Sequence, residues 1–102
     1  MRCRRCSPVP EEVRRAAGLL ERRWTISILY ASVEGAQRFN EFVEALGRVS
    51  PATLTARLSE LVEAGVLERC VLDTRPPSVE YRLTIIGKRL EPLLRELARV
   101  SF

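Results

Sequence analysis

Ser50-Pro51 and Gly65 enclose the segment that most constrains how this 102-residue chain can fold. Ser is a favoured N-cap residue, Pro suits the first helical position, and Gly permits the left-handed backbone that ends many helices. Between these signals, apolar residues recur at the spacing of one helical face: Leu54, Leu58, Leu61 and Val62. The sequence therefore predicts an amphipathic helix over residues 51–64 with one buried stripe.

A shorter helical segment comes directly before this helix. Asn40 is a suitable N-cap for a helix from Glu41 to Leu46, whose apolar residues would face inward, and Gly47 would stop it. Two short helices joined by a few residues have the form of a helix-turn-helix. The pair predicts such a motif, with residues 51–64 as its second helix.

Two further segments precede this pair. The first begins after Pro10, where Glu11 and Glu12 suit the positive end of a helix dipole. The second runs from Trp24 to Val33 and is apolar nearly all round, a pattern that fits a buried helix or a buried strand. Gly35 follows the second segment and would end it.

A β-hairpin is predicted after the helix of residues 51–64, over residues 66–83. The stretch from Val66 to Leu72 is strand-like, and residues 79–83 alternate apolar and polar side chains as a half-buried strand does. The polar loop between them, residues 73–78, contains Pro76-Pro77. Such a hairpin beside a helix-turn-helix is called a wing.

The C-terminal segment predicts one helix over residues 85–100, capped by Thr84 and kinked at Pro92. Its apolar residues form one long seam: Ile86, Leu90, Leu93, Leu94 and Leu97. A seam of this length in a small domain needs a partner, and a second copy of the chain is the simplest one. The expected fold is α+β, mainly α: a winged helix-turn-helix with N- and C-terminal dimerisation helices.

Charge and composition narrow the function further. The net charge of +4 lies in residues 1–23, with seven Arg against three Glu, whereas residues 24–102 carry ten basic and ten acidic groups. We therefore divide the chain into a basic tail, residues 1–10, and one domain, residues 11–102. The absence of His removes most catalytic triads and transition-metal sites, so we expect no enzyme, no metal and no cofactor. No run of about 18 apolar residues occurs, so we expect a cytoplasmic protein without membrane contact.

The order of these elements resembles the HxlR family of winged helix-turn-helix regulators, which are relatives of MarR-type proteins. The resemblance covers residues 13–100, and its matching stretches are Arg23-Trp24, Ile28-Leu29, Arg38-Phe39-Asn40-Glu41, Ser50-Pro51, Leu54-Thr55, Arg57-Leu58, Leu61, Glu63-Ala64-Gly65, Glu68-Arg69, Pro76-Pro77, Val79-Glu80-Tyr81, Leu83-Thr84 and Gly87. It favours a helix for residues 24–33. It also implies a dimer built from the terminal helices, a recognition helix in the major groove and a wing over the DNA backbone or minor groove.

The predicted DNA-binding residues lie mainly on the side of the recognition helix away from its leucines: Ala52, Thr53, Thr55, Ala56 and Arg57. Small and polar side chains near the start of such a helix can reach base edges, and Arg57 could reach guanine or a phosphate. Ser50, Arg38 and Arg75 at the hairpin tip, held extended by Pro76, are expected to contact phosphates or the minor groove. The alternative is a solvated helix face in which Arg57 pairs with Glu60 or Glu63.

Cys3 and Cys6 form a CxxC pair flanked by arginines, which favour the thiolate form. A redox switch, a zinc site and a pair of ordinary reduced thiols are the three interpretations, and two Cys without His fall short of a usual zinc ligand set. In the family, a Cys often stands directly before a Pro, whereas here Ser7 separates Cys6 from Pro8. That departure weakens a redox role taken over from the resemblance. Cys70 is predicted to be a small packing residue of a strand.

Together these features predict a sequence-specific transcriptional regulator, with repression the favoured mode, that binds double-stranded DNA as a homodimer on a pseudo-palindromic operator. The rival hypothesis is a winged-helix module for protein–protein contact that has no operator of its own. The sequence leaves open whether a redox signal or a small-molecule effector near the dimer seam controls it.

Overall fold

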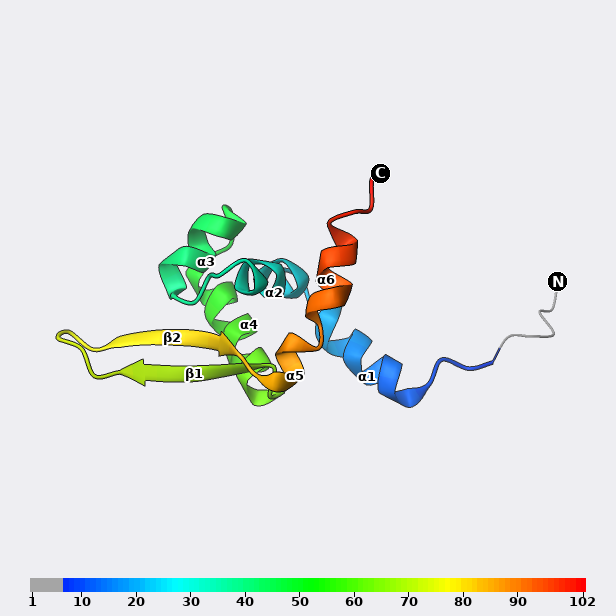
Figure 1. Cartoon of the computed structure of the whole chain (residues 1–102), viewed down its shortest axis with the longest axis horizontal. Coiled ribbons are helices and arrows are strands. Elements are labelled where there is room, and N and C mark those ends of the chain that lie inside the picture. The colour runs from blue at the N-terminus through cyan, green and yellow to red at the C-terminus, as the bar shows by residue number, and fades with distance from the viewer. Residues whose placement is uncertain (1–6) are drawn as a thin grey trace.

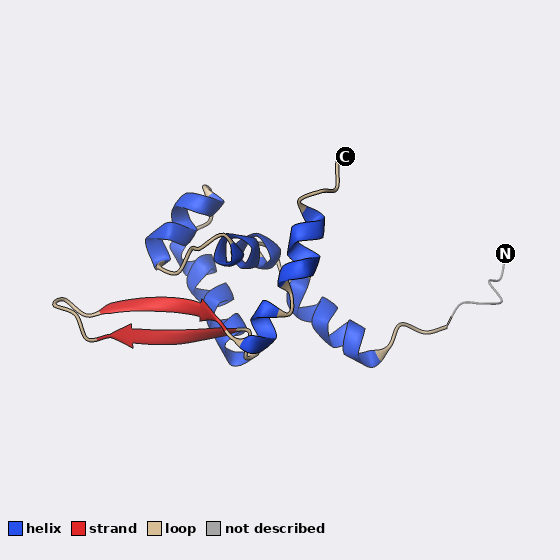
Figure 2. Cartoon of the chain, viewed as in Figure 1, coloured by secondary structure: helices blue, strands red, loops and turns tan. Residues whose placement is uncertain are grey.

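The computed structural model of the chain describes residues 7–102. Their helices are α1 (Glu11–Leu20), α2 (Thr25–Val33), α3 (Phe39–Leu46), α4 (Pro51–Glu63), α5 (Ile85–Lys88) and α6 (Glu91–Leu97), with strands β1 (Leu67–Leu72) and β2 (Ser78–Leu83) between α4 and α5. Figure 1 shows α3 and the hairpin toward one end of the molecule and α1 toward the other. The predicted class, a mainly helical α+β fold with one hairpin, is confirmed (Figure 2).

The core lies where α2, α3 and α4 meet. Its fully buried side chains come from all three helices and from the elements that close it: Ile28, Leu29, Phe42, Leu54, Leu58, Leu61, Leu67 and Leu94. The segment after Trp24 is thus a buried helix, as the resemblance favoured. Each of its aliphatic core residues excludes apolar surface from water, the dominant favourable term in folding.

Helix α4 begins and ends as the sequence predicts. The Ser50 hydroxyl accepts a hydrogen bond from the Thr53 N–H at 3.1 Å, and Pro51 occupies the first helical position. At the other end Gly65 has a φ of +79°, and the N–H groups of Gly65 and Val66 donate to the carbonyls of Val62 and Leu61. These two bonds form a Schellman motif, which satisfies carbonyl groups that the helix end would otherwise leave free.

The start of α3 differs from its prediction, because Asn40 does not cap it. The helix begins at Phe39 with Arg38 as its N-cap residue. The Glu41 carboxylate accepts hydrogen bonds from the N–H groups of Gln37, at 2.9 Å, and Arg38, at 2.8 Å. A carboxylate that reaches back in this way replaces a capping side chain ahead of the helix, and the two bonds hold the pKa of Glu41 below its ordinary value.

The C-terminal segment also differs, because it forms two helices instead of one kinked helix. Helix α5 ends at Lys88, the backbone turns through Arg89 and Leu90, and α6 starts at Glu91. Pro92 lies in the first turn of α6. A Pro within a continuous helix would lack a backbone donor and clash with the preceding turn, whereas in a first turn neither penalty applies.

The wing is an antiparallel pair in which Leu67 lies opposite Leu83 and Leu72 opposite Ser78. The Tyr81 N–H donates to the Gln37 carbonyl at 2.7 Å, which ties β2 to the segment ahead of α3. At its tip the chain bends at Arg75 and Pro76, whose peptide bond is cis, and does not run extended as predicted. No helix in residues 7–102 has the length and apolar character needed to cross a bilayer.

Candidate nucleic-acid interface

The outer face of α4 carries small side chains over its first three turns. Ala52, Thr55, Ala56 and Ser59 are exposed, while every leucine of the helix is buried. Thr53 is half-buried, and the Ser50 hydroxyl lies 2.8 Å from its hydroxyl oxygen. The face therefore offers methyl and hydroxyl groups. Their small size allows the helix backbone to lie close to a molecule that binds this face.

Arg57 lies on the same helix but is not free to extend from it. Its side chain is only 15% exposed. The guanidinium Nε donates to the Arg23 carbonyl at 2.9 Å, and Nη1 lies 3.2 Å from the Glu60 carboxylate. The structure thus shows the pairing with Glu60 that was the alternative for Arg57, and it adds a main-chain contact to the corner between α1 and α2.

The other predicted arginines lie apart from this face. Arg38 is half exposed at the start of α3, where its Nε is 3.9 Å from the Glu80 carboxylate on β2. Arg75 is exposed at the end of the hairpin, which extends away from the helices in Figure 1. The Thr74 hydroxyl donates to the Pro76 carbonyl at 2.7 Å and so closes the turn that presents Arg75.

Arg48 is an additional basic residue that sequence reasoning missed. It lies in the turn between α3 and α4, two residues before the cap of α4, and it is exposed. It makes no ion pair with the described part of the chain. Its place in the turn between the two helices was the signal that could have identified it.

The cysteines give a partial picture. Cys3 and Cys6 lie outside the described residues, so their geometry is not part of the site. Cys70 is half-buried on β1, which agrees with a packing role. Within residues 7–102, no group of three or more His, Cys, Asp or Glu side chains could hold a metal ion.

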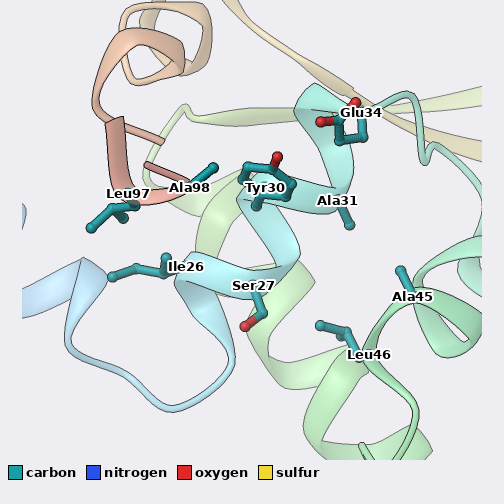
Figure 3. A pocket seen from close by; sticks show the side chains of 9 residues that line it. All are labelled: Ile26, Ser27, Tyr30, Ala31, Glu34, Ala45, Leu46, Leu97 and Ala98. Carbon is teal, nitrogen blue, oxygen red and sulfur yellow. The ribbon is translucent and has the colours of Figure 1, made fainter. Parts of the chain in front are cut away.

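A pocket of about 580 Å³ opens between α2, the end of α3 and the end of α6 (Figure 3). Its lining is mostly apolar: Ile26, Ser27, Tyr30, Ala31, Glu34, Ala45, Leu46, Leu97 and Ala98. The Glu34 carboxylate, as a hydrogen-bond acceptor and a negative charge, raises the pKa of Tyr30. Arg95 of α6 lies 3.1 Å from the same carboxylate, so the polar edge of the pocket is already paired.

The terminal helices expose apolar side chains that no other part of residues 7–102 covers. Helix α1 has no buried residue, and α6 has only Leu94. Val13 of α1 is 53% exposed, and Leu93 and Leu97 of α6 are 48% and 42% exposed. Contiguous exposed apolar surface often marks an interaction site. These residues therefore make α1 and α6 candidates for an interface.

These features define a winged helix-turn-helix protein: a three-helix core, the capped helix α4 with its exposed face of small residues, and the hairpin directly after α4. The comparisons with known proteins agree at every level. The family model described as HxlR-like helix-turn-helix matches residues 19–101. The chain belongs to this family, and it is a DNA-binding transcriptional regulator of the helix-turn-helix type.

Individual relatives carry the same assignment. The HTH-type transcriptional regulator YvaP of Bacillus subtilis is 39% identical over 85 residues, which are 83% of this chain and 79% of that protein. YodB, an HTH-type transcriptional regulator of the same organism, is 35% identical over 80% of this chain and 73% of its own length. The chain spans 50–61% of the length of several other curated regulators.

Solved structures extend the likeness to the fold. The redox regulator HypR in its oxidized form has a TM-score of 0.80 at 32% identity, with 86% of this chain and 91% of that one covered. The reduced form of YodB has a TM-score of 0.80 at 32% identity and covers 90% of both chains.

Proposed function

We propose that this protein represses transcription in the cytoplasm as a homodimer bound to a pseudo-palindromic operator, and that it acts by binding rather than by catalysis. The observation that carries the proposal is the exposed face of α4, where small side chains stand over the buried leucines. Recognition helices read bases with the residues of their first turns. Methyl groups of Ala52 and Ala56 suit a thymine methyl, and the Thr55 hydroxyl suits a base edge.

Phosphate contacts are assigned to groups outside this face. They are the Ser50 hydroxyl and the N–H groups at the start of α4, together with the side chains of Arg38, Arg48 and Arg75, which come before and after α4 in the sequence. Neutralising phosphates releases counterions, so affinity should fall steeply as salt rises. Arg57, which is held by Glu60 and the Arg23 carbonyl, is less suited to direct base reading than to positioning.

Dimerisation is supported by the uncovered apolar residues of α1 and α6. A second copy related by a two-fold axis would bury the same patch on both subunits. Two recognition helices related in this way would read half-sites about one helical turn apart, roughly 34–36 Å.

The test is a selection of genomic fragments by the purified protein under reducing conditions, followed by sequencing. Enrichment of a short palindrome is expected, and repression is checked by transcription from an enriched promoter with and without the protein. Recovery of no fragment above random duplex would contradict the proposal and favour the rival protein-interaction module.

A pair of variants makes the test specific to α4. Ala56→Glu places a negative charge on the exposed face, so binding to the enriched duplex should fall at least about ten-fold by repulsion from phosphate. Lys88→Gln changes the net charge by the same amount on α5 and should change affinity much less. Equal losses would indicate that only overall charge matters.

Redox control is the favoured form of regulation. Relatives that are named redox regulators support it, as do the CxxC residues Cys3 and Cys6. The thiol-oxidising agent diamide should change DNA binding by the wild type and by Cys70→Ser, but not by a Cys3→Ser, Cys6→Ser double variant. If diamide changed DNA binding by the double variant as much as by the wild type, this assignment would be contradicted. An effector that acts through another site, such as the pocket in Figure 3, would then be favoured.

A further inference from the structure

A cluster of three charged side chains joins the recognition helix to the end of α1. The Glu60 carboxylate oxygen Oε2 lies 3.0 Å from Arg22 Nη2 and 3.2 Å from Arg57 Nη1. Arg57 also donates from Nε to the main-chain carbonyl of Arg23 at 2.9 Å. One carboxylate oxygen therefore joins two guanidinium groups, and one of these groups also contacts the backbone of a different element.

The backbone that this cluster contacts is unusual. Trp24, directly after Arg23, has a φ of +79° although it is not a glycine. A bulky residue in the left-handed region is strained and persists only where its surroundings hold it. The Thr25 N–H donates to the Arg22 carbonyl at 3.1 Å, and the Arg23 guanidinium stacks 5.3 Å from the Trp24 ring centroid. The Arg57 bond to the Arg23 carbonyl connects this backbone to α4.

We propose that Arg22, Glu60 and Arg57 are positioning residues, which fix the orientation of α4 relative to α1. The inference rests on the proposed role of α4 in reading DNA. Arg57 and Glu60 lie on the same helix as Ala56, so a displacement of the α1–α2 corner moves the reading face through them. A guanidinium can hold this arrangement because its rigid fork donates to the carboxylate and the carbonyl together.

The alternative role for Glu60, a carboxylate that acts only through its charge, predicts the opposite effect of a substitution on DNA affinity. If Glu60 were only a negative charge near DNA, Glu60→Gln would reduce repulsion from phosphate and tighten binding to every duplex. If Glu60 joins Arg22 to Arg57, the same substitution leaves two neighbouring cations without their anion, and the α1–α2 corner and α4 lose their fixed relation. Binding to the preferred duplex then weakens more than binding to random duplex does.

The experiment compares the affinities of wild type and variants for the selected and a random duplex over a range of salt concentrations. Glu60→Gln and Arg22→Gln should each lower the ratio of the two affinities by about five- to ten-fold, with no change in the salt slope. Their double variant should lose little more than either single one. Glu63→Gln removes the same charge from the same helix and is the control, with an unchanged ratio.

Two further measurements separate this role from others. Arg57→Lys keeps the charge but lacks the fork, so it should lower the ratio as well. If Arg22 contacted phosphate directly, Arg22→Gln would weaken both duplexes equally and reduce the salt slope by about 1. That result, or a Glu60→Gln variant that behaves like Glu63→Gln, would overturn the proposal.

Amide hydrogen exchange makes the outcome independent of the operator. Glu60→Gln should accelerate exchange of the Thr25 N–H at the corner, whereas Glu63→Gln should not. If no duplex is preferred, only the proposed function fails. Exchange at Thr25 still decides whether Arg22, Glu60 and Arg57 connect α4 to the α1–α2 corner. Unchanged exchange in folded Glu60→Gln protein would refute it.

Discussion

The three-helix core and the terminal helices are built from similar apolar residues but use them differently. In the core, Leu54 and Leu58 of α4 are completely buried. In the terminal helices, Val13 and Leu97 remain about half exposed. The core is therefore complete within one chain, whereas α1 and α6 present apolar surface that the rest of residues 7–102 leaves exposed.

This difference separates folding from assembly. A buried leucine contributes to the stability of the single chain, while a half-exposed leucine contributes most when a partner buries it. The predicted dimer surface lies on the terminal helices α1 and α6, whereas the predicted DNA-reading surface lies on α4, near the middle of the molecule in Figure 1. Substitutions in the two regions should therefore affect different measurements.

The largest effect is expected in the core. Leu58→Ala removes a side chain with 0% exposure and should lower the free energy of unfolding by about 2–5 kcal/mol, measured by urea unfolding. Val71→Ala on β1, where the side chain is 61% exposed, is the control and should cost less than about 0.5 kcal/mol. Similar losses for both would mean that the core does not dominate stability.

The next effect concerns assembly. Leu97→Glu places a charge on the exposed face of α6, and because the proposed dimer contains two copies it should weaken association by about 2–4 kcal/mol. Light scattering during size-exclusion chromatography should then show a monomer that is still folded. Val71→Glu adds the same charge to the wing and should stay dimeric. A dimeric Leu97→Glu protein would remove α6 from the interface.

A smaller effect is expected at the junction of the two regions. A Cβ on Gly87 of α5 would meet the Val66 carbonyl oxygen and the Leu83 side chain. Gly87→Ala should therefore cost about 1–3 kcal/mol, measured by thermal unfolding. Gly18→Ala on α1 meets no atom within 4 Å and should stabilise the helix by about 0.5–1 kcal/mol. A loss of stability in Gly18→Ala as well would contradict the open surroundings of Gly18.

The smallest effect is a pH dependence at the start of α3. The folded state lowers the pKa of Glu41, so its contribution to stability is present above the ordinary carboxyl pKa and is lost as the pH falls through the lower folded value. Glu41→Gln should therefore reduce the loss of stability between neutral and acidic pH, measured by urea unfolding along a pH series. Glu44→Gln on the same helix is the control, and an identical effect in both would assign the dependence to general charge.

Local signals in the sequence determined much of this protein. Ser50-Pro51 and Gly65 predicted both ends of α4 to within one residue, because capping depends on residues adjacent in the chain. The period of the leucines predicted which face of α4 is buried, and the alternating strand predicted the wing. The family resemblance resolved residues 24–33, where an all-round apolar pattern fits a helix or a strand equally well.

Only the tertiary structure decided how distant residues meet. The position of Arg57 on α4 was evident, but its bond to the Arg23 carbonyl crosses 34 residues and follows no local pattern. The sequence misplaces the cap of α3, because Glu41 reaches back to two backbone donors. It also predicts one C-terminal helix where two form, because Pro92 can start a new helix as well as kink an existing one. Local sequence sets which elements form, whereas side-chain direction and long-range packing set which of their residues remain free to contact DNA.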